Sequence, residues 1–253
     1  MSMFEIVFSP TGGTEKVSGL VTGTLDGNIV TVDLTDSGLD FHGVSMAKGD
    51  VAVISVPSYA GRVPAVAVER LGMVRGNGAR AVLVCVYGGR AFEDTLIELE
   101  DVAKRAGFRV VAAVSAIAEH SVARQFAAGR PDAQDVAQLS EFAQRIRQKL
   151  LNGAASEPSI PGNRPYKQAG GHSMVPHATE DCVSCGACAA LCPVRAIDKD
   201  DPRQVDGEAC ISCMRCVSVC SQNARKLDPN KLAAVTQMLS KACVERRECE
   251  IFI

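Results

Sequence analysis

The first 150 residues alternate short apolar runs with stretches in which apolar side chains recur at helical spacing. The apolar runs, such as Val51–Val56, are continuous rather than alternately apolar and polar. Continuous runs are expected for strands that are buried on both faces of a parallel sheet. The pattern predicts five strands: Phe4–Phe8, Ile29–Asp33, Val51–Val56, Ala81–Val86 and Arg109–Ser115.

Four amphipathic stretches predict helices that alternate with these strands: Thr14–Leu25, Pro64–Arg75, Phe92–Ala106 and Pro131–Leu151. A further crossover helix is expected within Thr35–Gly49, although that segment is short and weakly patterned. Strands alternating with helices are typical of an α/β fold with helices on both faces of the sheet. The elements fit a doubly wound, parallel, five-stranded sheet of order 2-1-3-4-5.

The loop after the first strand combines glycines with hydroxyl side chains and runs directly into a helix. Converging backbone N–H groups, hydroxyl donors and a helix N-terminus form a cradle for an oxyanion. Neither the Gly-x-x-x-x-Gly-Lys-Ser/Thr nor the Gly-x-Gly-x-x-Gly motif occurs, which weakens an ATP or dinucleotide interpretation. The loop resembles the phosphate loop of flavodoxins, and this resemblance implies that it binds the phosphate of FMN. A plain turn remains the alternative. The predicted phosphate-binding residues are Ser9, Thr11, Gly12, Gly13 and Thr14.

Two later loops strengthen the interpretation as a flavin site, because ligands of doubly wound sheets lie beyond the carboxyl ends of the strands. Tyr59 and Tyr87, two of only three tyrosines, fall on these loops, where flavodoxins place residues that line the flavin ring. An aromatic face there can stack on the ring, and small residues let the backbone approach its edge. The alternative is that both tyrosines simply pack at strand ends. The predicted ring-binding residues are Pro57, Ser58, Tyr59, Ala60, Gly61, Tyr87, Gly88, Gly89 and Arg90.

Two arginines and one histidine lie on or close to the predicted flavin loops. One hypothesis for Arg62 and Arg90 is that a cation near the ring favours the reduced flavin and raises the reduction potential of the flavin. A solvated arginine or a phosphate partner is an equally good interpretation of either residue. His120, after the fifth strand, could reach the site, although a histidine on a surface loop is the simpler interpretation.

Two runs of cysteines near the C-terminus share the spacing Cys-x2-Cys-x2-Cys-x3-Cys. In such runs three thiolates surround one face of an iron–sulfur cube, and the fourth cysteine binds the other cluster. Zinc sites and disulfide frameworks rarely show this spacing. The spacing predicts two [4Fe–4S] clusters. The ligands of one are Cys182, Cys185, Cys188 and Cys220, and those of the other are Cys192, Cys210, Cys213 and Cys216.

Residues 179–227 resemble a bacterial two-cluster ferredoxin, including the Pro-Val-x-Ala-Ile run of residues 193–197 after the first motif. The resemblance implies a small α+β domain. The second motif departs from the pattern because Ser221 stands where the first has Pro193, but every cysteine ligand is in place. Because exposed clusters are quickly lost to oxygen, we expect a reducing cytoplasm and an anaerobic host.

Composition excludes several classes of protein. The 27 basic residues nearly balance 29 acidic ones, so no charge directs the chain to nucleic acid or lipid. The N-terminus lacks the pattern of a signal peptide, and the longest apolar stretch is too short to span a bilayer. Eight of the eleven cysteines belong to the two motifs, and Cys85, Cys243 and Cys249 are best interpreted as buried or partly buried free thiols.

The segment between the two regions is rich in proline, glycine and serine, which predicts an extended linker. We expect a flavodoxin-like FMN domain at residues 1–151, a linker at 152–177 and a ferredoxin-like domain at 178–227. Residues 228–253 should form a helix, beginning at Asp228-Pro229, and a tail that packs back on one of the domains because its end is too apolar to stay in solvent.

As a whole, the chain resembles the iron–sulfur flavoproteins in which a flavodoxin is fused to a ferredoxin, on the residues 9–14, 56–64, 87–99 and the two cysteine motifs. The resemblance implies electron transfer between an external carrier, two [4Fe–4S] clusters and FMN. Two alternatives stay open: a flavin-dependent reductase of a small molecule, and a redox sensor whose flavodoxin domain has lost its flavin. The expected partner is a redox protein or a small-molecule acceptor. The sequence leaves open which cluster faces the flavin and whether the chain forms a homodimer.

Overall fold

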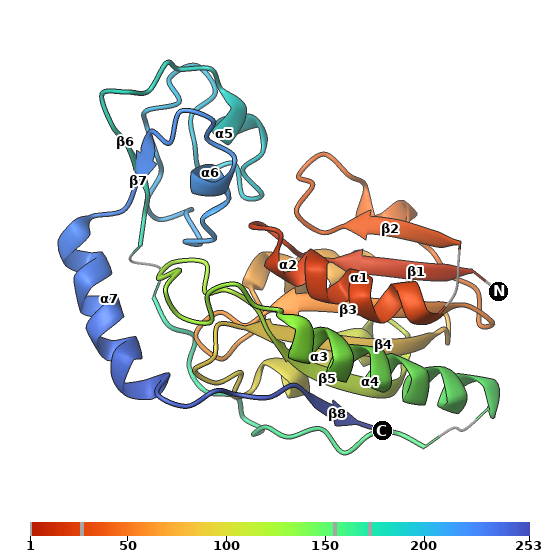
Figure 1. Cartoon of the computed structure of the whole chain (residues 1–253). Helices are drawn as coiled ribbons and strands as arrows, with labels where there is room; N and C mark the ends of the chain where they lie inside the picture. Colours follow the sequence, from red (N-terminus) through yellow and green to blue (C-terminus); the bar gives the residue numbers. More distant parts are fainter. Residues whose placement is uncertain (1, 26–27, 154–155, 172–173) are drawn as a thin grey trace.

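A computed structural model describes residues 2–25, 28–153, 156–171 and 174–253. Figure 1 shows a layered α/β region and a small region rich in loops, joined by an extended segment and a C-terminal helix. The predicted linker is described except for residues 154–155 and 172–173, which lie outside the described ranges.

Six strands form the main sheet in the order β2-β1-β3-β4-β5-β8. The first five are parallel, and their order 2-1-3-4-5 confirms the predicted flavodoxin-like topology. Their bounds are β1 (Met3–Val7), β2 (Ile29–Asp33), β3 (Val51–Pro57), β4 (Arg80–Tyr87) and β5 (Arg109–Ile117).

Two helices cover each face of the sheet, and successive residues of the central strands enter opposite cores. In β3, for example, Val53 packs with α1 and α4, whereas Ile54 packs with α2 and α3. This burial on both faces explains why the strands are continuous apolar runs. The helices are α1 (Gly13–Leu25), α2 (Ala65–Met73), α3 (Thr95–Arg105) and α4 (Ala133–Leu151).

The helix expected within Thr35–Gly49 does not form, and that prediction was wrong. Only a single 3₁₀ turn, Phe41–Gly43, occurs there. Side chains of this segment bond the local backbone instead: Asp36 accepts from Gly38 N–H, and Asp40 from His42 N–H, at 2.7 and 3.0 Å. Such side-chain turns compete with helical hydrogen bonding and account for the loop.

The cysteine-rich region is built from short elements, β6 (His177–Ala178), α5 (Ala187–Ala190), α6 (Arg215–Ser218) and β7 (Arg225–Lys226). It lies against the loops at the carboxyl edge of the sheet (Figure 1). Arg70 of α2 donates to the Pro193 carbonyl at 2.5 Å, and Arg195 donates to the Ser37 carbonyl at 2.6 Å. Val194 and Ile211 pack against the core formed by α2, α3 and the sheet.

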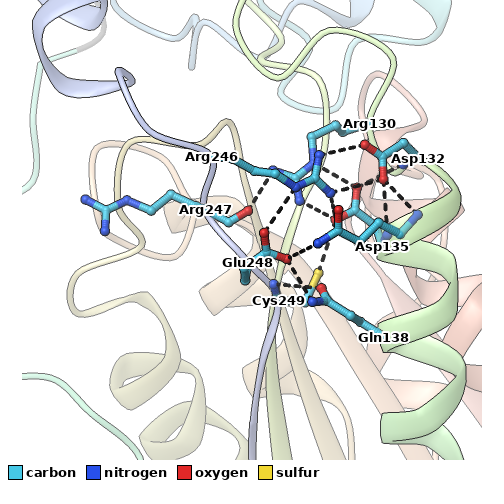
Figure 2. Close-up of polar contacts among 9 residues, drawn as sticks. Arg130, Asp132, Asp135, Gln138, Arg246, Arg247, Glu248 and Cys249 are labelled. Atoms are coloured by element: carbon cyan, nitrogen blue, oxygen red, sulfur yellow. Dashed lines mark hydrogen bonds and ion pairs between the residues drawn. The ribbon is translucent and has the colours of Figure 1, made fainter.

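The chain returns from the cysteine-rich region to the sheet through α7 (Pro229–Ala242) and β8 (Glu250–Phe252). β8 pairs antiparallel with β5 and becomes a sixth strand. Figure 2 shows how the residues before β8 are held on α4: Arg246 binds Asp132 at 2.7 Å, and Gln138 donates to Glu248 at 2.8 Å. The C-terminal tail is therefore part of the α/β region.

Candidate redox site

A cavity of about 410 Å³ lies at the carboxyl ends of the parallel strands. Its size falls within the range of small-molecule and cofactor sites, roughly 300–1,000 Å³. The loops after β1, β3, β4 and β5 form most of its wall, and two segments outside the α/β domain complete it: residues 169–171 of the linker, and Ile211 and Ser212 of the second cysteine motif.

The loop after β1 presents a helix N-terminus to the cavity. Glu15 N–H donates to the Ser9 hydroxyl at 2.9 Å, and Lys16 N–H donates to the Gly12 carbonyl at 3.0 Å. The N–H groups of Gly13 and Thr14, the first two residues of α1, precede these and have no acceptor inside the helix. Donors in this arrangement suit the phosphate of a flavin nucleotide. Ser9 itself acts as a cap of α1.

Tyr59 and Tyr87 line the cavity from neighbouring loops. Tyr87 makes an edge-to-face contact with Phe92, with ring centroids 5.6 Å apart, and burial raises the pKa of its hydroxyl to about 12. Burial first, and then the Cys213 sulfur, raise the pKa of the Tyr59 hydroxyl well above its usual value. Both tyrosines are therefore neutral at physiological pH, and Tyr59 lies between the cavity and the second cysteine motif.

His120 lines the cavity together with Ser121 and Val122, and the sequence interpretation as a simple surface residue missed this. Its Nδ1 accepts the N–H groups of Val122 and Ala123, at 3.2 and 3.1 Å. Burial and the neighbouring Arg90 charge lower the pKa of this imidazole. A Cβ at position 88 would overlap the ring, so Gly88 is needed for this close approach. In the sequence, the pair Gly88 and Gly89 after β4 is the signal that could have indicated this close approach of His120.

The two arginines of the flavin hypothesis are both held by carboxylates. Arg62 lines the cavity, but its Nε and Nη2 donate to Glu98, each at 2.7 Å, and its Nη1 donates to the Lys167 carbonyl. Arg90 binds Glu93 at 2.9 Å and lies outside the cavity wall. The Arg62 charge is thus largely neutralised by Glu98, which argues against its role in tuning the flavin potential.

The cavity wall brings together most, but not all, of the predicted flavin residues. Those that line it are Thr11, Gly13, Thr14, Pro57, Ser58, Tyr59, Ala60, Tyr87 and Gly88. Those that do not line it are Ser9, Gly12, Gly61, Gly89 and Arg90. Gly61 has a packing role, because a Cβ there would overlap the Glu93 carboxylate.

The eight motif cysteines surround two further, smaller cavities in the predicted sets of four. We call the cavity of the second motif the inner cavity, lined by Cys192, Cys210, Cys213 and Cys216. The other is the outer cavity, lined by Cys182, Cys185, Cys188 and Cys220. Two sulfurs accept equivalent backbone hydrogen bonds: Ala196 N–H donates to Cys192 and Ala224 N–H to Cys220, both at 3.3 Å. Each quartet of thiols fits a cubane cluster, and this ligand assignment stays a prediction.

Among the described residues, no three or more His, Cys, Asp or Glu side chains are placed to share one metal ion. Within the same ranges, no helix is long and apolar enough to cross a membrane.

Comparison with protein families decides the nature of the cysteine-rich region: residues 174–221 match the family model of the 4Fe-4S dicluster domain. The chain joins a flavodoxin-like domain to a 4Fe-4S dicluster domain. The dicluster domain implies two clusters and a part in electron transfer.

Solved structures similar to the α/β domain include several flavodoxins. Flavodoxin 2 of Bacillus cereus is 16% identical, with 59% of this chain and 99% of that chain covered and a TM-score of 0.44. The Fusobacterium nucleatum flavodoxin bound to flavin mononucleotide is 16% identical, with coverages of 58% and 96% and a TM-score of 0.38. The Megasphaera elsdenii flavodoxin is 16% identical, with coverages of 56% and 98% and a TM-score of 0.39. A search of curated proteins gave no match.

Proposed function

We propose that the protein transfers electrons between an external carrier, two [4Fe–4S] clusters and an FMN bound in the cavity at the sheet edge. The N–H groups of Gly13 and Thr14 suit the phosphate, and Tyr59 and Tyr87 line the space for the ring. A cluster passes one electron at a time, whereas bound FMN accepts one or two, so the pair can couple one-electron carriers to two-electron chemistry.

The observation that carries this proposal is the shared wall of the cavity. Ile211 and Ser212 lie between the cluster ligands Cys210 and Cys213 in sequence, and both line the cavity. The cluster of the inner cavity is therefore the one nearest the flavin. The outer cavity opens to solvent, where Val183 is 65% exposed and Cys185 is also exposed. The order of electron carriers is external partner, outer cluster, inner cluster and FMN.

Joining the carriers on one chain replaces a bimolecular encounter by a tethered one with a high effective concentration. The contacts of Arg70 with Pro193 and of Arg195 with Ser37 join the cysteine-rich region to the α/β domain beside the inner cavity. Eight cluster thiols and three further free cysteines suit a reducing compartment, and we place the protein in the cytoplasm.

The test uses the reconstituted full chain under anaerobic conditions, with reduced bacterial ferredoxin as the donor and flavin absorbance as the readout. Cys192→Ala removes a ligand of the inner cluster, and Cys220→Ala removes one of the outer cluster. Iron should fall from about eight to about four atoms per chain in either variant. Flavin reduction should slow at least about tenfold in both, because each variant interrupts the chain of carriers.

Three other outcomes each reject a defined part of the proposal. Unchanged flavin reduction in both variants overturns the relay. Slow reduction in Cys192→Ala alone overturns the order of the clusters, since electrons then enter at the inner one. A chain that holds its clusters but binds no added FMN overturns the flavin site and supports a redox sensor.

A further inference from the structure

Arg225 is a buried arginine beside the outer cavity, and it is 2% exposed. Its Nη2 approaches the Cys188 sulfur at 3.4 Å and donates to the Pro202 carbonyl. Its Nε and Nη1 are also buried, yet they have no hydrogen-bond partner among the described residues. None of the ion pairs in the described ranges involves Arg225.

A buried arginine destabilises the fold unless a negatively charged group lies close to its guanidinium. An arginine side chain stays protonated in proteins, and a buried donor without an acceptor costs about 1–3 kcal/mol. An isolated buried charge costs more. Two unpaired donors and an uncompensated cation at the edge of one cavity therefore point to an anionic ligand in that cavity.

The two cysteine motifs show that this cation is not a general requirement of the fold. Arg225 lies five residues after Cys220, and Ile197 lies five residues after Cys192. Both side chains are buried, Ile197 at 4% exposure, and both line a cluster cavity. An apolar side chain therefore fills at the inner cavity the position that a guanidinium occupies at the outer one.

We infer that Arg225 donates hydrogen bonds to the sulfur atoms of the outer cluster and raises the potential of that cluster. A cubane cluster held by four thiolates is anionic and supplies the missing acceptors. Reduction adds one electron and one negative charge, which a buried cation stabilises more than it stabilises the oxidised cluster. The inference rests on the two clusters of the proposed function and is independent of the flavin.

The first test is a redox titration of the cluster signal by electron paramagnetic resonance. It uses Arg225→Gln and Arg225→Ile in a Cys192→Ala background, in which the outer cluster remains. The ratio of reduced to oxidised outer cluster at a given potential should fall at least tenfold, which is about 59 mV for a one-electron couple. Lys226→Gln is the matched control, because it removes the same charge from an adjacent but exposed residue.

Equal potentials in the Arg225 variants and in Lys226→Gln overturn the inference. A second measurement covers variants that fail to assemble the cluster. In protein labelled with ¹⁵N-arginine, the reduced outer cluster should show a ¹⁵N hyperfine coupling that persists in Arg203→Gln, a change at an exposed arginine of the same domain. Absence of this coupling in the otherwise unaltered chain also overturns the inference. Neither readout involves FMN, so a failure of the proposed flavin site would leave the inference about Arg225 unaffected.

Discussion

Ser184 and Ser212 occupy the same position in the two cysteine motifs and share a left-handed backbone, with φ of 52° and 54°. Their surroundings differ. Ser184 is exposed, whereas the Ser212 hydroxyl is buried, has no partner among the described residues and lies in the wall of the cavity at the sheet edge. A substitution at Ser184 therefore serves as a control for the same substitution at Ser212, because both change the same position of the motif and only Ser212 lines the cavity.

Ser212→Ala should weaken FMN binding because it removes a hydroxyl that the cavity leaves free for the ligand. Loss of one neutral hydrogen bond corresponds to about 1 kcal/mol, or roughly fivefold in Kd. Titration of the flavin-free chain with FMN, followed by quenching of flavin fluorescence, measures the effect. Ser184→Ala should leave the Kd unchanged. Equal Kd values in the two variants contradict a contact between Ser212 and the flavin.

Arg62→Ala should lower the free energy of unfolding and leave the flavin potential largely unchanged. Glu98 is 7% exposed on its side chain and accepts three bonds, two from Arg62 and one from Val63 N–H at 2.8 Å. Removing one partner of a buried ion pair leaves the other charge uncompensated, and we expect a loss of about 3 kcal/mol in the free energy of unfolding.

Chemical denaturation in urea, followed by circular dichroism, measures this loss. Arg145→Ala is the control, because it breaks an exposed pair with Glu141 on α4 and should cost less than about 1 kcal/mol. The opposite result would be a lower flavin potential in Arg62→Ala with an unchanged free energy of unfolding. That result would support Arg62 as a cation that raises the flavin potential.

The stability of the fold should decrease as the pH falls below the ordinary pKa of histidine, because of His120. Burial lowers the pKa of His120 in the folded chain, so the unfolded chain takes up a proton that the folded chain does not. The penalty is absent above about pH 6.5, the unperturbed value, and grows on acidification toward the lowered pKa. Urea denaturation at a series of pH values measures it.

His120→Asn should reduce this acid sensitivity, since an asparagine oxygen can still accept the N–H groups of Val122 and Ala123 and does not titrate. His42→Asn, at an exposed position, is the control. The same slope of stability against pH in His120→Asn and in the unaltered chain is incompatible with a half-buried, neutral His120.

The sequence predicted the sheet order because continuous apolar strands and amphipathic helices carry local periodic signals. The helix predicted within Thr35–Gly49 does not form because the carboxylates of Asp36 and Asp40 accept hydrogen bonds from nearby backbone N–H groups. The sixth strand was missed because β8 has only three residues and owes its position to pairing with β5. The linker wall and the position of Arg225 could not be foreseen either, since each depends on contacts between segments far apart in sequence.

Arg246→Ala should expose Cys249 to alkylation. Cys249 is a buried residue of the tail, and its sulfur lies 3.8 Å from Asp135. Burial raises the pKa of its thiol to about 11, so it reacts only when the tail opens. Arg246 holds the tail through Asp132 and Asp135, at 2.7 and 3.3 Å (Figure 2).

Loss of these ion pairs should raise the labelling rate of Cys249 by iodoacetamide severalfold, as measured by peptide mass spectrometry. Arg247→Ala is the matched control, because that side chain points away from the network in Figure 2. Cys243, which is only half-buried, provides an internal reference for Arg246→Ala and should react there at the same rate as in the unaltered chain. Equal labelling of Cys249 in both variants means that other contacts, such as the strand pairing of β8 and the bond between Gln138 and Glu248, keep the tail closed without Arg246.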